Sequence, residues 1–227
     1  MHFTKRIIVT ICISASLLVI LVVAIIFKIT SVKTVLPTNK ENSVPFTSQA
    51  PQGNWQEPWQ NACEEASIVM IQNFYKDEGL SPEKARQQIL DVFKLKKTTA
   101  PASKDESLER IEEIINSGDL KWKVRVVDNP DLAAIKTELS ANHPVIASVY
   151  APLLNNPNYG SPGPTYHVIV ITGYDDAKNE FITNDPGTEE GKGYRYSYDV
   201  LLKALHDYLA NKDYKAGAKR VLFTELR

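Results

Sequence analysis

The sequence YHVIVITGYDDAKNEFITNDP, residues 166–186, predicts two β-strands joined by a short polar turn. Residues 167–172 and 180–183 are rich in Val, Ile and aromatic side chains, which strands favour. The residues between them, Asp175 to Asn179, have the composition of a chain reversal. We therefore expect an antiparallel hairpin in the second half of the chain.

The sequence around this hairpin predicts further strands after it and before it, and helices earlier in the chain. The strands are expected at 145–150 and 220–223, where β-branched and aromatic residues gather. Helices are expected over 61–75, from Ser81-Pro82-Glu83 onward, over 105–115 and over 129–140, from apolar periodicity and helix-start signals. Helices first and strands later indicate an α+β fold rather than alternating βαβ units.

The N-terminal region is different in character. Residues 7–27 form a run of 21 residues without a charge, dominated by Ile, Val and Leu. About 20 apolar residues suffice for a transmembrane helix, whereas a cleaved signal has an apolar region of about 7–15. We favour an uncleaved signal anchor, with a cleaved signal peptide as the alternative. The predicted organisation is a membrane anchor at 1–30, a linker at 31–43 and a catalytic domain at 44–227.

Charge divides the chain in the same way. Five of the 26 basic residues and none of the 27 acidic residues lie in 1–40, so residues 41–227 carry 21 basic and 27 acidic residues, a net charge of −6. An acidic domain gives no support for nucleic-acid binding. The usual orientation of a signal anchor places this domain outside the cytoplasm, on a single-pass membrane protein. The bilayer is therefore an expected partner through residues 7–27.

Cys63 is a candidate nucleophile. It lies at the start of the predicted 61–75 helix, where the partial positive charge and free N–H groups stabilise a thiolate and a developing oxyanion. Glu64 and Glu65 follow directly, and their negative charge opposes the thiolate. The alternative is a buried structural thiol. Cys12, the other cysteine, lies in the predicted membrane span.

His167 and Asp185 are the candidate base and orienting carboxylate. A hairpin centred on residue 176 places His167 opposite Asp185 or within one residue of it. Facing side chains of such a pair are about 4.5–5.5 Å apart at Cβ, which permits an imidazole–carboxylate hydrogen bond. With a cysteine, these residues would complete a nucleophile–base–orienter triad. A half-buried histidine paired with a turn aspartate for stability alone is the alternative.

Four short motifs in this order resemble those of a known family. They are VPFTSQ at 44–49, NACEEAS at 61–67 with Met70, HVIVITGY at 167–174 and NDPG at 184–187. The chain resembles the bacteriocin-processing, double-glycine leader peptidases, family thirty-nine of the cysteine peptidases, and more closely their stand-alone bacterial relatives. The resemblance covers about residues 44–190 and implies a papain-like fold.

The resemblance also implies roles for individual residues. Cys63 would be the nucleophile, His167 the general base and acid, Asp185 the group that orients His167, and Gln49 a side-chain donor to the oxyanion hole. Relatives commonly have Cys-Gly-Pro-Ala-Ser where this chain has Cys-Glu-Glu-Ala-Ser at 63–67. Gln49 also lies farther before Cys63 than in the leader peptidases, so Gln56 and Gln60 remain alternatives.

These observations predict a membrane-anchored cysteine peptidase that acts on a peptide or protein through an acyl-enzyme. Such a reaction requires neither a metal nor an organic cofactor. Two alternatives remain open: a catalytically silent peptide-binding module of the same fold, and a cell-wall amidase or acyltransferase with the same triad. Trp55, Trp59 and the long loop at 151–165 are candidate walls of the substrate cleft.

Overall fold

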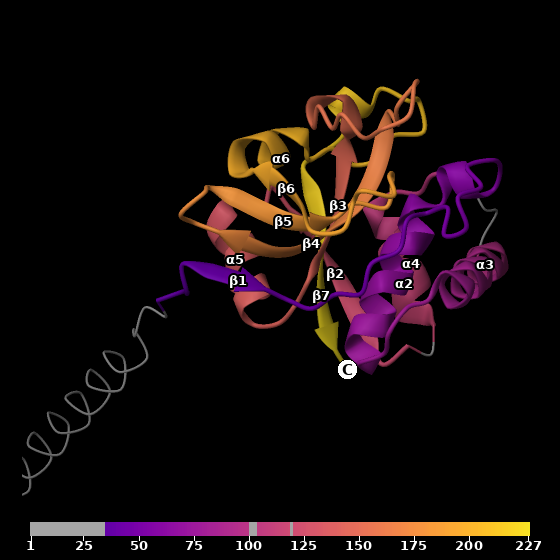
Figure 1. Ribbon diagram of the computed structural model, residues 1–227, viewed down its shortest axis with the longest axis horizontal. Helices are drawn as coiled ribbons and strands as arrows, with labels where there is room; N and C mark the ends of the chain where they lie inside the picture. The colour runs from indigo at the N-terminus through magenta and orange to yellow at the C-terminus, as the bar shows by residue number, and fades with distance from the viewer. Residues whose placement is uncertain (1–34, 100–103, 119) are drawn as a thin grey trace, which may run out of the picture. The chain divides into compact units, whose positions relative to one another are not determined.

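The described residues, 35–99, 104–118 and 120–227 of a computed structural model, form a mixed α/β structure around one antiparallel sheet (Figure 1). Residues Pro37–Arg227 make up one structural unit. The predicted membrane span, residues 7–27, lies outside the described residues. In the part of the chain that the structure describes, no helix combines the length and the apolar character needed to cross a bilayer.

The sheet has the strand order β2-β7-β3-β4-β5-β6, and β1 pairs with β4. All of its neighbouring strands are antiparallel. The strands are β1 (Asn39–Glu41), β2 (Trp122–Asp128), β3 (Val145–Tyr150), β4 (Tyr166–Asp175), β5 (Glu180–Asn184), β6 (Tyr194–Ser197) and β7 (Arg220–Leu226).

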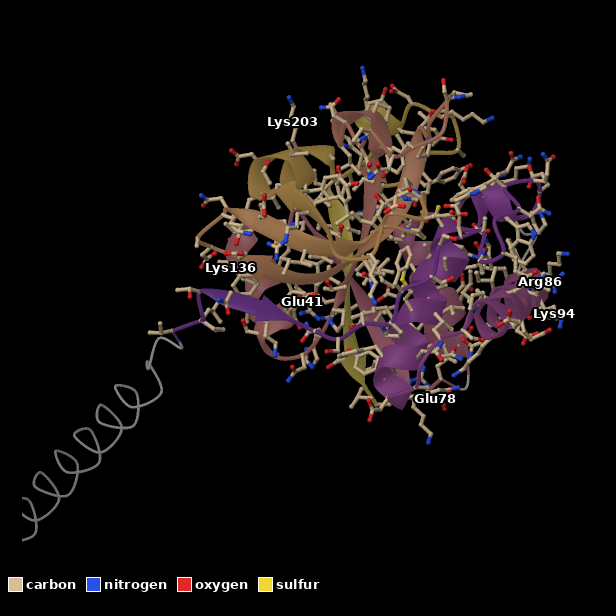
Figure 2. All side chains as sticks on the ribbon, in the orientation of Figure 1. Glu41, Glu78, Arg86, Lys94, Lys136 and Lys203 are labelled. Atoms are coloured by element: carbon tan, nitrogen blue, oxygen red, sulfur yellow. The ribbon has the colours of Figure 1, made fainter. Side chains whose placement is uncertain are left out.

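The helices cover both faces of the sheet (Figure 1). They are α2 (Cys63–Lys76), α3 (Pro82–Thr99), α4 (Leu108–Ser117), α5 (Leu132–Ser140) and α6 (Tyr198–Ala204). Short 3₁₀ turns occur at η1 (Trp59–Asn61), η2 (Ala151–Leu153) and η3 (Tyr214–Ala216). Charged side chains such as Lys94 and Lys203, labelled in Figure 2, lie exposed on the outer surfaces of α3 and α6.

The strand β4 explains why the core has two halves. Its alternate residues Val168 and Val170 pack with side chains of α2, α3 and α4, whereas Ile169 and Ile171 pack with side chains of α5 and α6. A strand covered on both faces is a continuous apolar run rather than an alternating one. This is why the sequence HVIVIT carries no polar position between His167 and Thr172.

Side-chain caps begin four of the helices. Ser81 Oγ accepts the N–H of Lys84 before α3, and Ser107 Oγ accepts that of Arg110 before α4. Asp131 Oδ1 accepts the N–H of Ala134 before α5, and Ser197 Oγ accepts that of Val200 before α6. Each cap satisfies a backbone donor that the first turn leaves unpaired. The start signal predicted at Ser81 is confirmed.

The predicted helices and strands are present, with shifted boundaries. The helix expected over 61–75 begins at Cys63, because Trp59–Asn61 forms a 3₁₀ turn. The helix expected over 105–115 runs over Leu108–Ser117, and that over 129–140 begins at Leu132. The strand β1 lies inside the stretch predicted to be a linker, and β2 and β6 were not predicted. The expected combination of helices with an antiparallel sheet is confirmed.

Candidate active site

Cys63 is the first residue of α2, and its side chain is only 4% exposed. The N-cap residue, Ala62, has no side chain that can cap the helix. The first-turn N–H groups therefore receive no side-chain hydrogen bond from the N-cap, and they point toward the nucleophile's end of the helix. Cys63 and His167 line the same cavity, with a volume of about 300 Å³.

The surroundings of Cys63 keep its thiol protonated. The thiol donates a hydrogen bond to Oε2 of Glu64, with an Sγ–Oε2 distance of 3.7 Å. Burial raises the pKa of Cys63 well above its ordinary value, and the carboxylates of Glu64, Asp105 and Glu65 raise it further whenever they are ionised. These effects outweigh the helix N-terminus, whose dipole alone is worth about 0.3–1 kcal/mol. The predicted opposition of the two glutamates to the thiolate is therefore present for each of them when it is ionised.

His167 and Asp185 are in direct contact. His167 Nε2 lies 2.7 Å from Asp185 Oδ1, and the side chains are 1% and 0% exposed. Because this bond uses Nε2, Nδ1 is the ring nitrogen that remains to exchange a proton in the cavity. A buried carboxylate at this position holds the ring and stabilises an imidazolium.

The register of the hairpin differs from the expected one. Tyr174 pairs with Phe181, but after a bulge between Ile171 and Gly173 the last pair is Val170 with Asn184. If this register continued, Asp185 would face Ile169, two residues from His167. The two functional side chains therefore meet as diagonal neighbours on one face, which long or aromatic side chains can bridge.

Three polar side chains that were not predicted hold the Asp185 carboxylate. Oδ2 accepts hydrogen bonds from the phenol groups of Tyr159 and Tyr196, both at 2.7 Å, and from Asn156 Nδ2 at 3.3 Å. Burial raises the pKa of Asp185, but the charge and hydrogen bond of His167 and the two phenol donors overcome it and hold the pKa below its ordinary value. Asp185 therefore stays ionised beside His167.

The glycines after β5 allow the chain to fold closely around these residues. A Cβ on Gly187 would lie 2.8 Å from His167 Nε2, and one on Gly191 would collide with the Asp185 carbonyl. The backbone N–H of Gly187 also donates to Asp185 Oδ1 at 3.0 Å. The NDPG motif thus supplies the carboxylate, ends the strand at Pro186 and leaves room for the imidazole.

Of the three candidate glutamines, Gln49 is the one buried in the cleft. Its Nε2 donates to the Trp59 carbonyl at 3.0 Å, and its Oε1 has no hydrogen-bond partner among the described residues. Gln49 lines the cavity that contains Cys63. Gln60 lies exposed at the rim of the same cavity and donates to Glu57, and Gln56 is exposed.

A second, larger cavity of about 790 Å³ adjoins the first, and Gln49 and Gln60 line both. Trp55 and residues 160–164 of the long loop form part of its wall, as expected for a substrate cleft. Glu189 and Glu190 line it as well. Trp59, the other candidate, is buried in the core and lines neither of these two cavities. Among the described residues, no cluster of three or more His, Cys, Asp or Glu side chains could hold a metal ion.

Comparison with known proteins identifies a family for this chain. A family model described as the Peptidase C39 like family matches residues 41–216. A structure described as that of a C39-like peptidase from Bacillus anthracis has a TM-score of 0.52 at 11% identity, covering 83% of this chain and 98% of that one. Its fold is shared by this chain.

A more distant likeness is to xylellain, a cysteine protease from Xylella fastidiosa. The two chains are 12% identical, and the comparison covers 85% of this chain and 87% of that one. The TM-score of 0.44 is too low for this likeness to bear on the fold. None of the curated proteins matches the chain in sequence.

Proposed function

Because the chain belongs to the peptidase C39-like family of cysteine peptidases, we propose that it hydrolyses peptide bonds with Cys63, His167 and Asp185 as its catalytic triad. The observation that carries this proposal is the buried 2.7 Å bond between His167 and Asp185 on the cavity that Cys63 also lines. The nucleophile at a helix N-terminus, packed against an antiparallel sheet that bears the other two residues, also supports the implied papain-like fold.

The reaction follows from the protonation states. The Cys63 thiol is neutral in the free protein, so His167 removes its proton as sulfur attacks the carbonyl carbon. The C–N bond then breaks, and the amine leaves with the proton from His167. Water attacks the resulting thioester with His167 as base and releases the acid. Asp185, ionised throughout, stabilises the imidazolium in both steps.

The oxyanion is held by the backbone N–H of Cys63 and the side-chain N–H of Gln49. A side-chain amide has two N–H donors, and only one of those of Gln49 is needed for the Trp59 carbonyl. The second donor belongs to a side chain that lines the same cavity as Cys63. The larger cavity, with Trp55 and the 160–164 loop, binds the peptide on one side of the scissile bond.

We also propose that residues 7–27 anchor the protein in the membrane and that residues 41–227 act outside the cytoplasm. The length and apolar character of that segment support this setting. The substrate would then be a peptide or protein at the cell surface. A double-glycine leader peptide is one of the substrates to test.

The raised pKa of Cys63 favours a second candidate, a peptide-binding module without catalysis. Hydrolysis of a peptide library by the full chain in detergent separates the two. The peptidase proposal predicts cleavage that Cys63→Ala and His167→Ala abolish and that Asp185→Asn reduces by about 10³–10⁴-fold. His143→Ala is the matched control, because His143 pairs with Glu138 away from both cavities, and it should leave cleavage unchanged. Binding without cleavage by the wild type would favour the second candidate.

A further inference from the structure

Glu64 reaches the nucleophile from the first turn of α2. Its Oε2 is 3.7 Å from the Cys63 sulfur, and its Oε1 accepts the backbone N–H of Glu106 at 2.8 Å. The residue is only 1% exposed, although glutamates are almost never fully buried unless paired. Its two contacts hold the carboxyl group in one orientation, with one oxygen directed at the reacting atom.

The charges around Glu64 do not balance if it is ionised. Glu64 and Glu65 are both buried beside Lys96, whose Nζ lies 2.7 Å from Glu65 Oε1. One buried ammonium compensates one buried carboxylate, and a second carboxylate is then favoured in its neutral form. Burial and the repulsion of Glu65 raise the pKa of Glu64 to about 8, despite the opposing charge of Lys96. Glu64 is therefore protonated at neutral pH.

A neutral carboxyl group is a hydrogen-bond donor, which an ionised one is not. We propose, on the basis of the proposed peptidase function, that neutral Glu64 is a further catalytic residue, which donates its O–H to the Cys63 sulfur as the thiolate forms. The thiol proton passes to His167 Nδ1 while sulfur forms its bond to the carbonyl carbon. The sulfur therefore never carries the full negative charge that would take the Glu64 proton, and that proton remains on Oε2. When Glu64 loses its proton to solvent, its carboxylate instead accepts the S–H and repels the thiolate.

Other ionisable groups face the same place from every neighbouring segment. They are Cys63, Glu65, Lys96, Asp105, Glu106, Tyr166, His167, Tyr208, Lys212 and Tyr214. Asp105 is the informative one, because it lines the cavity and its charge also opposes the thiolate. Unlike Glu64, it is not the acceptor of the Cys63 thiol. Asp105→Asn is therefore the matched control for a carboxyl group near the sulfur.

The test is the rate of Cys63 alkylation by iodoacetamide between pH 6 and pH 9 in the full chain, read by mass spectrometry of the Cys63 peptide so that Cys12 is scored separately. The rate follows the thiolate. In the wild type it should rise to about pH 8 and then flatten, because the thiolate needs neutral Glu64. Glu64→Gln keeps an acceptor and a donor but never ionises. The ratio of its alkylation rate to that of the wild type should rise from about 1 at pH 6 to about 10 at pH 9.

A Glu64→Gln to wild-type ratio that stays constant across this range would overturn the inference, whatever its size. So would the same pH-dependent ratio in Asp105→Asn. Circular dichroism shows whether Glu64→Gln folds. If it does not fold, the dependence of the wild-type alkylation rate on pH tests the inference by itself. A rate that keeps rising about tenfold per pH unit above pH 8 would exclude neutral Glu64 as a donor to the Cys63 sulfur. Peptide cleavage is measured on the same samples. If the peptidase proposal is wrong, no peptide is cleaved although the ratio of alkylation rates still depends on pH. If the proposed role of Glu64 is wrong, the ratio does not depend on pH although peptides are cleaved.

Discussion

The carboxylate of Asp185 receives hydrogen bonds from His167, two tyrosines, an asparagine and a backbone N–H while it is completely buried. A buried anion is costly unless such donors surround it. The donors make Asp185 a fixed negative charge, so His167 has one orientation and one preferred partner. At the scale of the residue, Tyr159 and Tyr196 thus help to hold the carboxylate that orients His167.

Tyr196→Phe tests this dependence. Loss of one phenol donor should raise the pKa of Asp185 toward its ordinary value, so the acid limb of the kcat/KM profile should move up by about one pH unit. Removing a hydrogen bond to a charged group should also lower the free energy of unfolding by about 1.5–3 kcal/mol at pH 7. The measurements are a pH–rate profile and urea unfolding.

The sign of the stability effect follows from the lowered pKa of Asp185. Its ionised form stabilises the fold fully above the unfolded pKa of about 3.9, and this contribution is lost as pH falls through the folded pKa. In Tyr196→Phe the loss should begin at higher pH than in the wild type. Tyr194→Phe is the control, because the described structure shows no hydrogen bond from its phenol to Asp185. An unchanged acid limb in Tyr196→Phe would show that the phenol does not tune the carboxylate.

The three residues of the proposed triad could be picked out from the sequence because each belongs to a local pattern: a helix start for Cys63 and the two ends of one hairpin for His167 and Asp185. Tyr159, Tyr196 and Asn156 could not. They come from the long loop and from β6, and only the folded chain brings them to Asp185. Glu64 and Glu65 were predicted to oppose the thiolate, but their burial with Lys96 depends on how α3 packs.

At the scale of the element, the buried pair Glu65–Lys96 ties the nucleophile helix α2 to α3. Lys96→Met should leave Glu65 buried without its partner and lower the free energy of unfolding by about 3–5 kcal/mol. The double variant Glu65→Leu with Lys96→Met should recover most of that loss, since replacing a buried pair by apolar residues is often neutral. Urea unfolding with a double-mutant cycle measures both.

The control is Lys94→Met, also on α3, where the exposed lysine pairs with Asp91. It should change the free energy of unfolding by no more than about 0.5 kcal/mol. Equal effects of Lys94→Met and Lys96→Met would mean that the buried pair does not secure α2.

The turn after β5 is the second element that the site needs. Gly187→Ala places a methyl group against His167 Nε2 and Tyr159, so the imidazole must move away from Asp185. A displacement of about 1 Å should lower kcat by about 100-fold while changing KM little. Steady-state kinetics measures both constants. Gly79→Ala, where the new methyl group meets no atom within 4 Å, should behave as the wild type. Full activity in Gly187→Ala would contradict the close packing of this turn on His167.

Helices with caps and apolar periodicity could be predicted from the sequence, because those signals are local. The strand β1 could not, since Asn39–Glu41 is three polar residues that pair with β4 only where Gly173 leaves room for the Lys40 backbone. The bulge near Gly173 also changes the hairpin register by one residue, so that Asp185 would face Ile169, on the same face as His167, instead of Val170. A bulge adds a residue to one strand without a composition that distinguishes it from its neighbours.

At the scale of the whole molecule, we expect the full chain to sediment with membranes and to resist carbonate extraction. Arginine at the centre of a membrane-spanning helix costs about 2.5–3.5 kcal/mol per residue, so Leu18→Arg with Val23→Arg should shift the protein to the soluble fraction. Thr34→Arg, outside the apolar run, is the control. A mature N-terminus between residues 28 and 40, found by N-terminal sequencing, would instead show a cleaved signal peptide.

The most direct test of the peptidase proposal is the detection of an acyl-enzyme on Cys63. The full chain is mixed with a cleaved peptide, quenched in acid within the first turnovers and digested for mass spectrometry. The triad predicts that the Cys63 peptide gains the mass of the acyl half of the substrate, as a thioester that hydroxylamine removes, and that Cys63→Ala shows neither adduct nor cleavage. Cleavage that persists in Cys63→Ala, or turnover with no adduct on Cys63, would contradict the mechanism.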